Sequence, residues 1–169
     1  KTRDQNLTKP SGSLGRLEKI SHWLAAWQGR HPPQIKSARA QVFAGNHGIA
    51  QKGVSAYPSA VTEQMVGNFL SGGAAINQLC KTFDIDLKVD AIDLDNPTTD
   101  FSEGPAMTES ETLKSICFGM DKVDETLDIL CLGEMGIGNT TSAAAICYAL
   151  YGGSANDWTG PGTGIEGEA

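Results

Sequence analysis

One segment combines glycines with a carboxylate in a pattern suited to binding an anion. It reads Gly133-Glu134-Met135-Gly136-Ile137-Gly138-Asn139-Thr140-Thr141 and lies between an apolar run and an alanine-rich run. A strand, a glycine loop and a helix in this order present unpaired N–H groups and a partial positive charge to a phosphate. Asn139 stands where the P-loop pattern has its lysine, and Thr141 stands where the dinucleotide pattern has its third glycine. The spacing therefore favours a single phosphate over a nucleoside triphosphate, with an ordinary strand-to-helix turn as the alternative.

Three other segments place polar side chains among glycines or prolines. They are Gly45-Asn46-His47-Gly48, Ser55-Ala56-Tyr57-Pro58 and Gly160-Pro161-Gly162-Thr163-Gly164. The first follows a β-like run, and open α/β sheets bind their ligands where the strands end. The third resembles a backbone nest for an anion. Each also has a plainer interpretation, namely a turn, a helix start and a flexible tail, respectively.

The elements that position these segments are predicted from hydrophobic periodicity. Leucine, isoleucine and tryptophan recur every three or four residues from Leu14 to Trp27, which predicts an amphipathic helix. Thr108 and Glu111 form a capping box that starts another helix. Further helices are expected at 58–69, 74–83 and up to residue 151, and strands at 40–44, 87–94 and 127–132. The last strand is apolar enough to be buried on both faces, as central parallel strands are.

Strands that alternate with helices indicate an α/β fold with right-handed crossovers. We expect a Rossmann-like parallel sheet with flanking helices. Residues 1–36 are expected to form an N-terminal helical segment that belongs to a small helical domain, and residues 37–169 the α/β domain.

Composition and charge exclude several classes of protein. With 40% hydrophobic and 20% charged residues among 169, the chain is expected to fold around a core of one ordinary domain. The formal charge of −7 argues against a nucleic-acid or anionic-membrane surface, and no apolar run is long enough to span a membrane. The cysteines lack metal spacing and are expected to be buried and reduced: Cys80, Cys117, Cys131 and Cys147. Without a signal peptide at Lys1, a cytoplasmic location is expected.

Several of these segments together resemble one family, nicotinate-nucleotide:dimethylbenzimidazole phosphoribosyltransferase. The matching stretches are LTKPSGSLGRLEKISHWLAAWQGR, VFAGNHGIAQKGVSAYPSAVTEQMV, SGGAAINQL, EGPAMTESE, LCLGEMGIGNTTSAA and DWTGPGTGI. They occur in family order over almost the whole chain. Family members are about twice as long, so the resemblance implies an N-terminal half and an incomplete phosphoribosyltransferase domain at 37–169.

The resemblance implies a reaction and its partners. The phosphoribosyl group of nicotinate mononucleotide passes to 5,6-dimethylbenzimidazole, which gives nicotinate and α-ribazole 5′-phosphate in cobalamin biosynthesis. It implies no metal and no other cofactor, and it suggests a homodimer, to which the apolar pair Trp23 and Trp27 would contribute. The general base of the family is a glutamate near the C-terminus and is absent from this chain, so residues 1–169 alone are expected to have little or no turnover.

The resemblance also assigns roles to residues. Glu134 is expected to lie beside the ribose and stabilise the oxocarbenium-like centre. The phosphate-binding residues would be Gly136, Ile137, Gly138, Asn139, Thr140, Gly162 and Thr163. The base-binding residues would be Asn46, Ser55, Tyr57, Gln64 and Met65. Two alternatives share the same glycine loop: a non-catalytic domain that binds a phosphorylated ligand, and a purely structural subunit.

Overall fold

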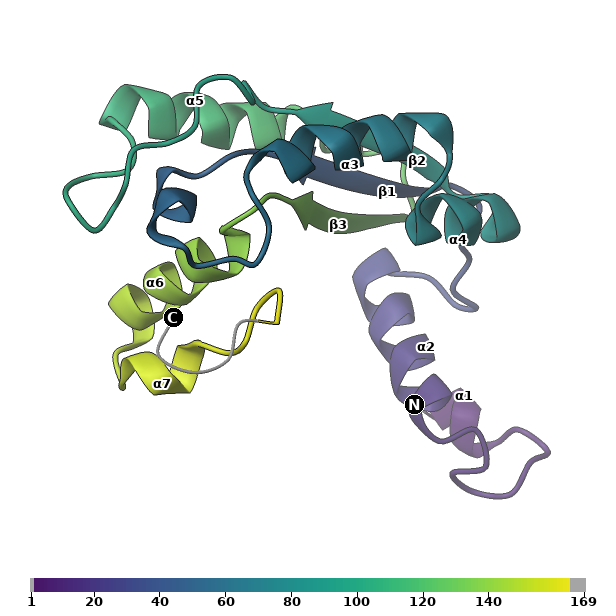
Figure 1. Cartoon of the computed structure of the whole chain (residues 1–169). Helices are drawn as coiled ribbons and strands as arrows, with labels where there is room; N and C mark the ends of the chain where they lie inside the picture. Colours follow the sequence, from purple (N-terminus) through teal and green to yellow (C-terminus); the bar gives the residue numbers. More distant parts are fainter. Residues whose placement is uncertain (1, 165–169) are drawn as a thin grey trace.

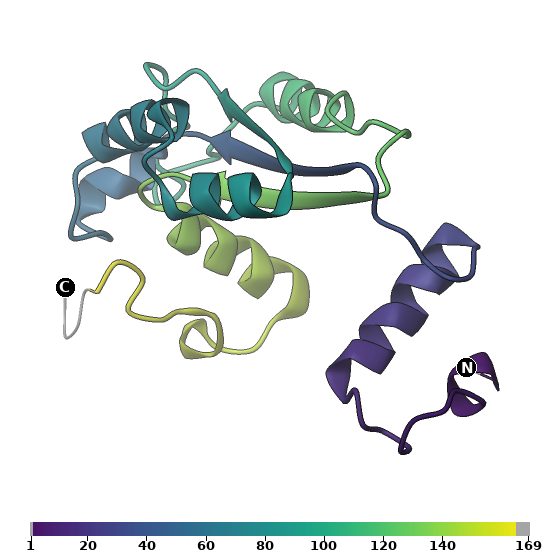
Figure 2. The ribbon, with the colours of Figure 1, turned by 90° about the vertical axis from the view of Figure 1, so that its right-hand side faces the viewer.

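The structure is a computed structural model and describes residues 2–164. Three strands and the helices around them alternate along the chain, as expected for an α/β fold (Figure 1). The elements are α1 (Thr2–Gln5), α2 (Arg16–Gln28), β1 (Ala38–Ala44), a 3-10 helix (Gly48–Lys52), α3 (Ala60–Ser71), α4 (Ala75–Phe83), β2 (Asp86–Ala91), α5 (Glu109–Met120), β3 (Ile129–Met135), α6 (Asn139–Tyr151) and α7 (Ala155–Trp158). In both views α1 and α2 stand apart from the sheet, whereas α3 and α4 lie against it (Figures 1 and 2).

The sheet is parallel throughout and has the order β2-β1-β3. Ala44, at the end of β1, is opposite Ala91 of β2 and Met135 of β3. The chain moves from β1 to one neighbour and then returns past β1 to the other. The carboxyl ends of all three strands therefore meet at one edge, and the direction of winding reverses between β1 and β3.

The core lies on both faces of β1. Ala40, Val42 and Ala44 point to one face and are buried, while Gln41 and Phe43 point to the other. The Phe43 ring meets Phe118 of α5 edge to face, with centroids 6.2 Å apart. On the same face as Phe43, the buried Gln41 side chain donates from Nε2 to Asp90 Oδ2 at 2.7 Å. Asp90 also accepts from Lys122 Nζ at 2.9 Å, so its carboxylate pairs with both side chains.

Most of the predicted elements are confirmed, with small changes at their ends. The capping box is present, since Glu111 N donates to Thr108 Oγ1 at 3.2 Å and Thr108 N donates to Glu111 Oε2 at 2.7 Å. The last strand runs three residues further than expected, to Met135, because its ladder with β1 continues through the first glycine of the loop. Glu134 therefore lies on a strand and not in the loop.

Two expectations about burial are wrong. The strand expected at the centre of the sheet, β3, has a neighbour on one side only within residues 2–164, and Leu132 is 71% exposed. The apolar sequence of β3 requires cover for this strand, and residues 2–164 do not provide all of that cover. The thiols are free, but Cys80 alone is buried, and burial raises its pKa. Cys117 on α5 is exposed, and so is Cys131, which lies on β3 opposite the buried Ala40.

The loop after β1 is held in place by the segment that follows β2. The Gly48 N–H donates to the Thr98 carbonyl at 2.8 Å, and a bridge pairs His47 with Thr98. A Cβ on Gly48 would lie 2.6 Å from the Thr98 oxygen and 2.7 Å from the Asp100 nitrogen. That wall is itself rigid, because the Ser102 N–H and hydroxyl donate to Asp100 and lower the pKa of its carboxyl group.

Replacing Gly48 by alanine is therefore expected to destabilise the intact protein by about 1–3 kcal/mol through overpacking. Gly67→Ala is the matched control, because Gly67 lies inside α3 with open space around it. That substitution should be neutral or stabilise by up to about 1 kcal/mol. Chemical denaturation of the two variants measures the difference, and equal midpoints would contradict the packing argument.

The N-terminal helices are joined to the sheet through Asp128, which precedes β3. Its carboxylate accepts from Lys36 N at 2.7 Å and from Ser37 N at 3.1 Å, and its own N–H donates to the Ser37 carbonyl at 2.9 Å. These backbone donors lower the pKa of Asp128 below its ordinary value. The connection after α2 thus enters the sheet at a defined point. The division at residues 36 and 37 into two domains stays a prediction.

Asp128→Asn is expected to destabilise the protein at neutral pH by an amount that disappears in acid. The folded-state pKa lies below the ordinary 3.8, so the carboxylate stabilises the fold above that value and ceases to do so as the pH falls through the lowered pKa. Unfolding followed from pH 7 to pH 2 for both proteins checks this. A difference that stays constant down to pH 2 would contradict it.

Candidate functional site

The predicted segments meet at the carboxyl edge of the sheet. The loop after β1 and the loop after β3 lie side by side there, since Gly45 N donates to the Met135 carbonyl at 3.0 Å. This is the point between β1 and β3 where the winding of the sheet reverses, and open α/β sheets bind ligands at such points. A ligand site at the strand ends was expected from the sequence, but the contact between the two loops was not.

Two glycines permit the close approach of these loops. A Cβ on Gly136 would collide with the Gly45 carbonyl oxygen and with the Asn139 side chain. Gly138 precedes α6 with φ of 93°, a conformation that favours glycine. Its Cα faces the side chains of His47 and Ile49, so the first turn of α6 starts directly against the loop after β1.

A buried hydroxyl on α3 fixes the middle of the glycine loop. Thr62 is fully buried, and its Oγ1 accepts from the Ile137 N–H at 3.1 Å. The Ile137 side chain is 4% exposed and anchors the loop in the core. The N–H of Ile137 is thus already paired, whereas a phosphate would need it free.

The start of α6 retains other donors for an anion. Asn139 N donates to the Gly136 carbonyl at 3.1 Å, but the N–H groups of Thr140 and Thr141 have no carbonyl four residues back within the helix. Thr140 is exposed, and its hydroxyl lies next to Gly162. The helix dipole adds a partial positive charge at this point.

Glu134 lies beside this helix start. It is the last but one residue of β3, opposite Phe43 of β1, and its side chain is exposed. Asn139 Nδ2 donates to Glu134 Oε2, so a side chain from α6 holds the carboxylate. A carboxylate and a helix N-terminus therefore lie next to each other at the edge of the sheet.

The Asn139 side chain is in turn held by His47. His47 Nε2 is hydrogen-bonded to Asn139 Oδ1, and Ser142 Oγ is 3.2 Å from His47 Nδ1. Together Glu134, Asn139, His47 and Ser142 form a continuous hydrogen-bonded row, here called the Glu134–Ser142 row. It ties the loop after β1 to β3 and to the first turn of α6.

The two segments rich in glycine, proline and hydroxyl groups also meet. Ser55 Oγ is 2.9 Å from Thr163 Oγ1, and the Ala56 N–H donates to the same hydroxyl at 3.0 Å. A Cβ on Gly162, where φ is 52°, would lie 3.4 Å from Thr140 Oγ1. The loop containing Gly162 and Thr163 therefore reaches the start of α6, although the Thr163 hydroxyl is engaged by the Ser55 segment.

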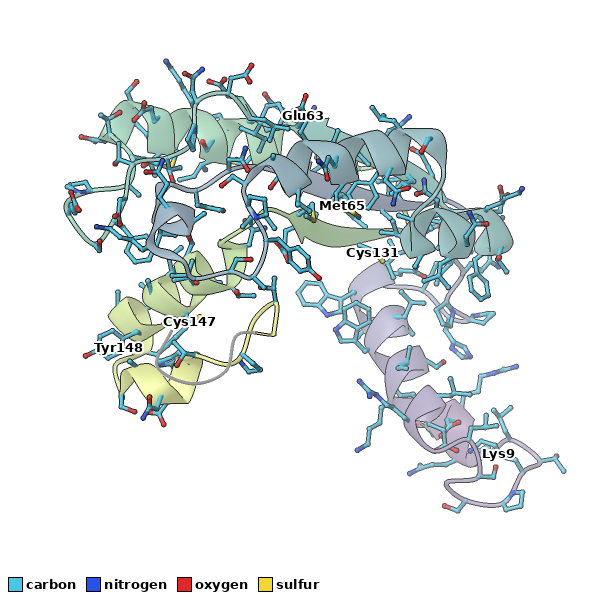
Figure 3. All side chains as sticks on the ribbon, in the orientation of Figure 1. Lys9, Glu63, Met65, Cys131, Cys147 and Tyr148 are labelled. Atoms are coloured by element: carbon cyan, nitrogen blue, oxygen red, sulfur yellow. The ribbon has the colours of Figure 1, made fainter. Side chains whose placement is uncertain are left out.

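The residues predicted to bind the aromatic base lie around this edge and differ in their exposure and hydrogen bonding. Asn46 Nδ2 donates to the Leu94 carbonyl at 2.9 Å, and its Oδ1 is buried without a partner among the described residues. Tyr57 is 56% exposed, beside Ser55, whose Oγ accepts from Tyr57 N at 3.2 Å. Gln64 is exposed and Met65 half-buried on α3, just beyond Thr62 (Figure 3). The base-binding set is thus spread over the loop after β1, the Ser55 segment and α3.

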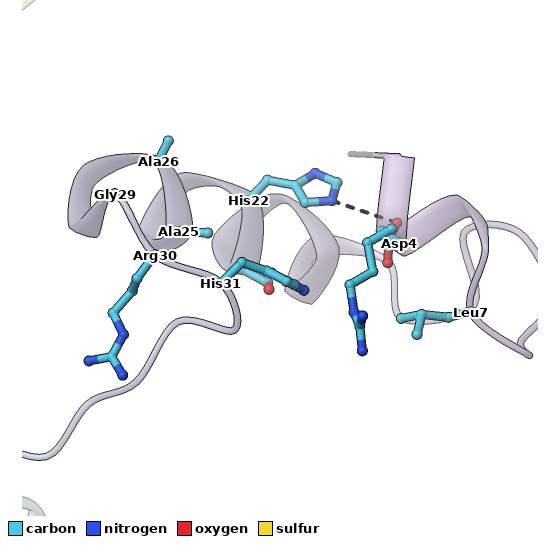
Figure 4. A pocket seen from close by; sticks show the side chains of 10 residues that line it. Asp4, Leu7, His22, Ala25, Ala26, Gly29, Arg30 and His31 are labelled. Atoms are coloured by element: carbon cyan, nitrogen blue, oxygen red, sulfur yellow. Dashed lines mark ion pairs between the residues drawn. The ribbon is translucent and has the colours of Figure 1, made fainter.

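A cavity elsewhere in the chain lacks these features. It has a volume of about 520 Å³ and lies between α1 and α2, where His22 pairs with Asp4 at 3.7 Å (Figure 4). It belongs to the N-terminal helices, away from the strand ends. Among residues 2–164, no group of three or more His, Cys, Asp or Glu side chains is placed to hold a metal ion. None of the helices within that range is long and apolar enough to cross a bilayer.

Two residues of this site are not predicted by the sequence. Thr62 carries no local signal, because a threonine in an amphipathic helix is ordinary and its partner is 75 residues away. Ser142 lies three residues after Asn139, on the same side of α6, so helical spacing was a usable signal. For His47, the sequence predicts only a turn or a pocket wall.

Comparisons with known proteins bear on this site. A family model described as phosphoribosyltransferase matches residues 1–169. Two proteins named nicotinate-nucleotide–dimethylbenzimidazole phosphoribosyltransferase, from Rhizobium etli (strain CIAT 652) and Methylocella silvestris, are both 57% identical to this chain, over 166 and 169 residues. The chain belongs to this phosphoribosyltransferase family. The crystal structure of CobT from Thermus thermophilus superimposes on this phosphoribosyltransferase chain with a TM-score of 0.86 at 40% identity, over 96% of this chain and 54% of that one.

The chain spans about half the length of the curated relatives it matches. The matches cover 98% and 100% of this chain but 49% and 50% of the two relatives. The resemblance to this phosphoribosyltransferase family, the α/β fold and the parallel sheet predicted from the sequence are confirmed.

Thr62→Val is expected to destabilise the intact phosphoribosyltransferase by about 1–3 kcal/mol, because it leaves the buried Ile137 N–H without an acceptor. Thr62→Ser keeps the acceptor and should lose less. Thr82→Val on the exposed side of α4 is the matched control, since its hydroxyl bonds within its own helix. Thermal or urea unfolding of the three variants measures this, and equal losses for Val and Ser would contradict the role of the hydroxyl.

Proposed function

We propose that the intact protein carrying these residues transfers the phosphoribosyl group of nicotinate mononucleotide to 5,6-dimethylbenzimidazole. The bond from the ribose anomeric carbon to the pyridinium nitrogen breaks, and a bond to one benzimidazole nitrogen forms with inversion. The other benzimidazole nitrogen gives up its proton, and nicotinate leaves. The observation that carries the proposal is the exposed Glu134 carboxylate next to the open N-terminus of α6 at the strand ends.

The phosphate is assigned to the start of α6. The amides of Thr140 and Thr141 have no backbone partner among the described residues, and together with the helix dipole they favour an anion there. Since the chain carries a formal charge of −7, attraction has to come from such local donors and not from the protein as a whole. Gly136 and Gly138 have no side chains, which lets the loop after β3 lie close to the loop after β1 and leaves room for the phosphate. Gly162 and Thr163 lie beside the start of α6. The Ile137 amide contributes to loop position through Thr62.

Glu134 is assigned to the ribose. When the glycosidic bond breaks, positive charge develops at the anomeric carbon, and a fixed carboxylate nearby stabilises that charge more than it stabilises the substrate. The contact with Asn139 holds the carboxylate before the substrate arrives. Holding the group in place avoids the cost of reorganising it during the reaction.

The benzimidazole is assigned to the side of the loop bounded by Asn46, Ser55, Tyr57, Gln64 and Met65. The Tyr57 ring is exposed enough to lie against a flat apolar base. Met65 offers an adaptable apolar contact from α3.

The general base is assigned to a part of the intact protein outside residues 1–169, which correspond to about half of each relative. Several apolar surfaces within the described residues fit a larger assembly. Leu132 on β3 is 71% exposed and Trp27 on α2 is 77% exposed. Tyr148 projects outward from α6, which is largely apolar after its polar first turn (Figure 3). We assign these surfaces to the remaining half of the protein and to a second copy in a cytoplasmic homodimer.

The test is conversion by the intact protein. Incubation with nicotinate mononucleotide and dimethylbenzimidazole should release nicotinate and α-ribazole 5′-phosphate in equal amounts, separated by liquid chromatography. Binding of the mononucleotide without any conversion would favour a non-catalytic domain that binds a phosphorylated ligand. Failure to bind any phosphorylated ribose would favour a structural role.

Glu134→Gln is expected to lower kcat by about 100-fold or more, because the amide cannot stabilise the developing charge. The KM for nicotinate mononucleotide should change far less. Glu109→Gln is the control, since that exposed glutamate lies in the first turn of α5 and not on a loop of the site. Initial rates of nicotinate release measure both, and wild-type kcat in the Glu134 variant would overturn its assignment.

A further inference from the structure

His47 makes two side-chain hydrogen bonds, and both lead to α6. Nε2 meets Asn139 Oδ1, and Nδ1 lies 3.2 Å from Ser142 Oγ. The ring comes from the loop after β1 and is half-buried against Gly138. It therefore connects two elements that are 92 residues apart in the sequence, at the place where the ligand is expected.

The partners define the direction of the hydrogen bonds in the row. Asn139 Nδ2 donates to the Glu134 carboxylate, which can only accept, so Asn139 Oδ1 faces His47 and must accept from it. Nε2 of His47 thus carries a hydrogen, and in the neutral imidazole Nδ1 accepts from the Ser142 hydroxyl. Every donor in the row points the same way, from Ser142 towards Glu134, and such a row strengthens each of its bonds.

The alternative orientation of the amide shows what His47 contributes. If Asn139 turned its side chain by 180°, its oxygen would face the carboxylate of Glu134 and repel it. The Nε2–H of His47 would then face the amide NH₂, and two donors would meet. Only the orientation that binds Glu134 satisfies both neighbours, so the histidine selects it.

The backbone of His47 is fixed independently of this row. It pairs with Thr98, and the next residue, Gly48, donates to the Thr98 carbonyl at 2.8 Å. The ring therefore approaches Asn139 from a rigid loop. A group on a rigid loop can orient a neighbour at little cost when the substrate arrives.

We propose that His47 is a positioning residue for the phosphoribosyl transfer: through Asn139 it holds the Glu134 carboxylate in the orientation that faces the ribose. This rests on the proposed function of Glu134. His47 does not touch the reacting atoms in this proposal. Its effect on the reaction passes entirely through the Asn139 amide.

Two substitutions distinguish the role of the Nε2 donor of His47 from that of the Nδ1 position. In His47→Gln the amide NH₂ reaches the place of Nε2 and can still donate to Asn139. In His47→Asn the shorter amide reaches only the place of Nδ1, opposite Ser142. In the intact protein His47→Asn is expected to lower kcat at least tenfold with the KM for nicotinate mononucleotide within threefold, and His47→Gln to restore most of the loss. His31→Asn, an exposed histidine among the N-terminal helices, is the control.

A double substitution tests whether the effect passes through the carboxylate. If it does, His47→Asn should cost little further kcat in a Glu134→Gln background, because there is no carboxylate left to hold. Asn139→Ala interrupts the row at a different residue and should show the same loss of kcat, which keeps the test open if His47→Asn does not fold. Multiplicative losses in the double variant, or wild-type kcat in both His47→Asn and Asn139→Ala, would overturn the proposal.

A second readout does not depend on turnover. The side-chain NH₂ protons of Asn139, identified by the loss of their NMR signal in Asn139→Asp, should exchange slowly in the wild type and in His47→Gln. In His47→Asn they should exchange at least tenfold faster. If the wild type shows no conversion but this pattern holds, the proposed function fails while the orientation by His47 stands. Equal exchange in all three proteins would overturn the positioning role whatever the activity.

Discussion

Parallel pairing of β1 on both of its sides is the constraint on which the site depends. Because Ala44 is aligned with Ala91 on one side and with Met135 on the other, all three strands end at the same edge. The chain that leaves each strand must turn there, and the turns are forced together. The polar residues that the sequence spreads over more than a hundred positions meet because of this register.

Once the strand ends meet, the backbone groups in the loops must be paired, and this decides which of them remain for a ligand. Thr62 takes the Ile137 N–H, and Gly136 takes that of Asn139. The amides of Thr140 and Thr141, in the first turn of α6, have no such partner among the described residues. Because the protein pairs the N–H groups of Ile137 and Asn139, the loop is held in one conformation. It can then bind a phosphate through the following N–H groups without a further loss of conformational entropy.

The same packing leaves large apolar side chains on the outside of β3, α2 and α6. A strand such as β3, with alternate apolar residues on both faces, is stable at the centre of a sheet and exposes its edge when it has one neighbour. Exposed side chains such as Leu132 and Trp27 are the surfaces that we assign above to an interface. The chain spans about half the length of the relatives it matches.

The sequence by itself determined the type and order of the elements, the family, and the segments that bear on function. Periodicity, the Thr108 capping box and the glycines between strands and helices are local signals, and the structure has helices and strands at those places with ends shifted by a few residues. The location of Glu134 on a strand, the edge position of β3, the pairing of Thr62 with Ile137 and the row from Glu134 to Ser142 were decided by tertiary structure. Propensity and spacing act within a few residues, whereas each of these contacts joins segments that become neighbours only when the parallel sheet has formed.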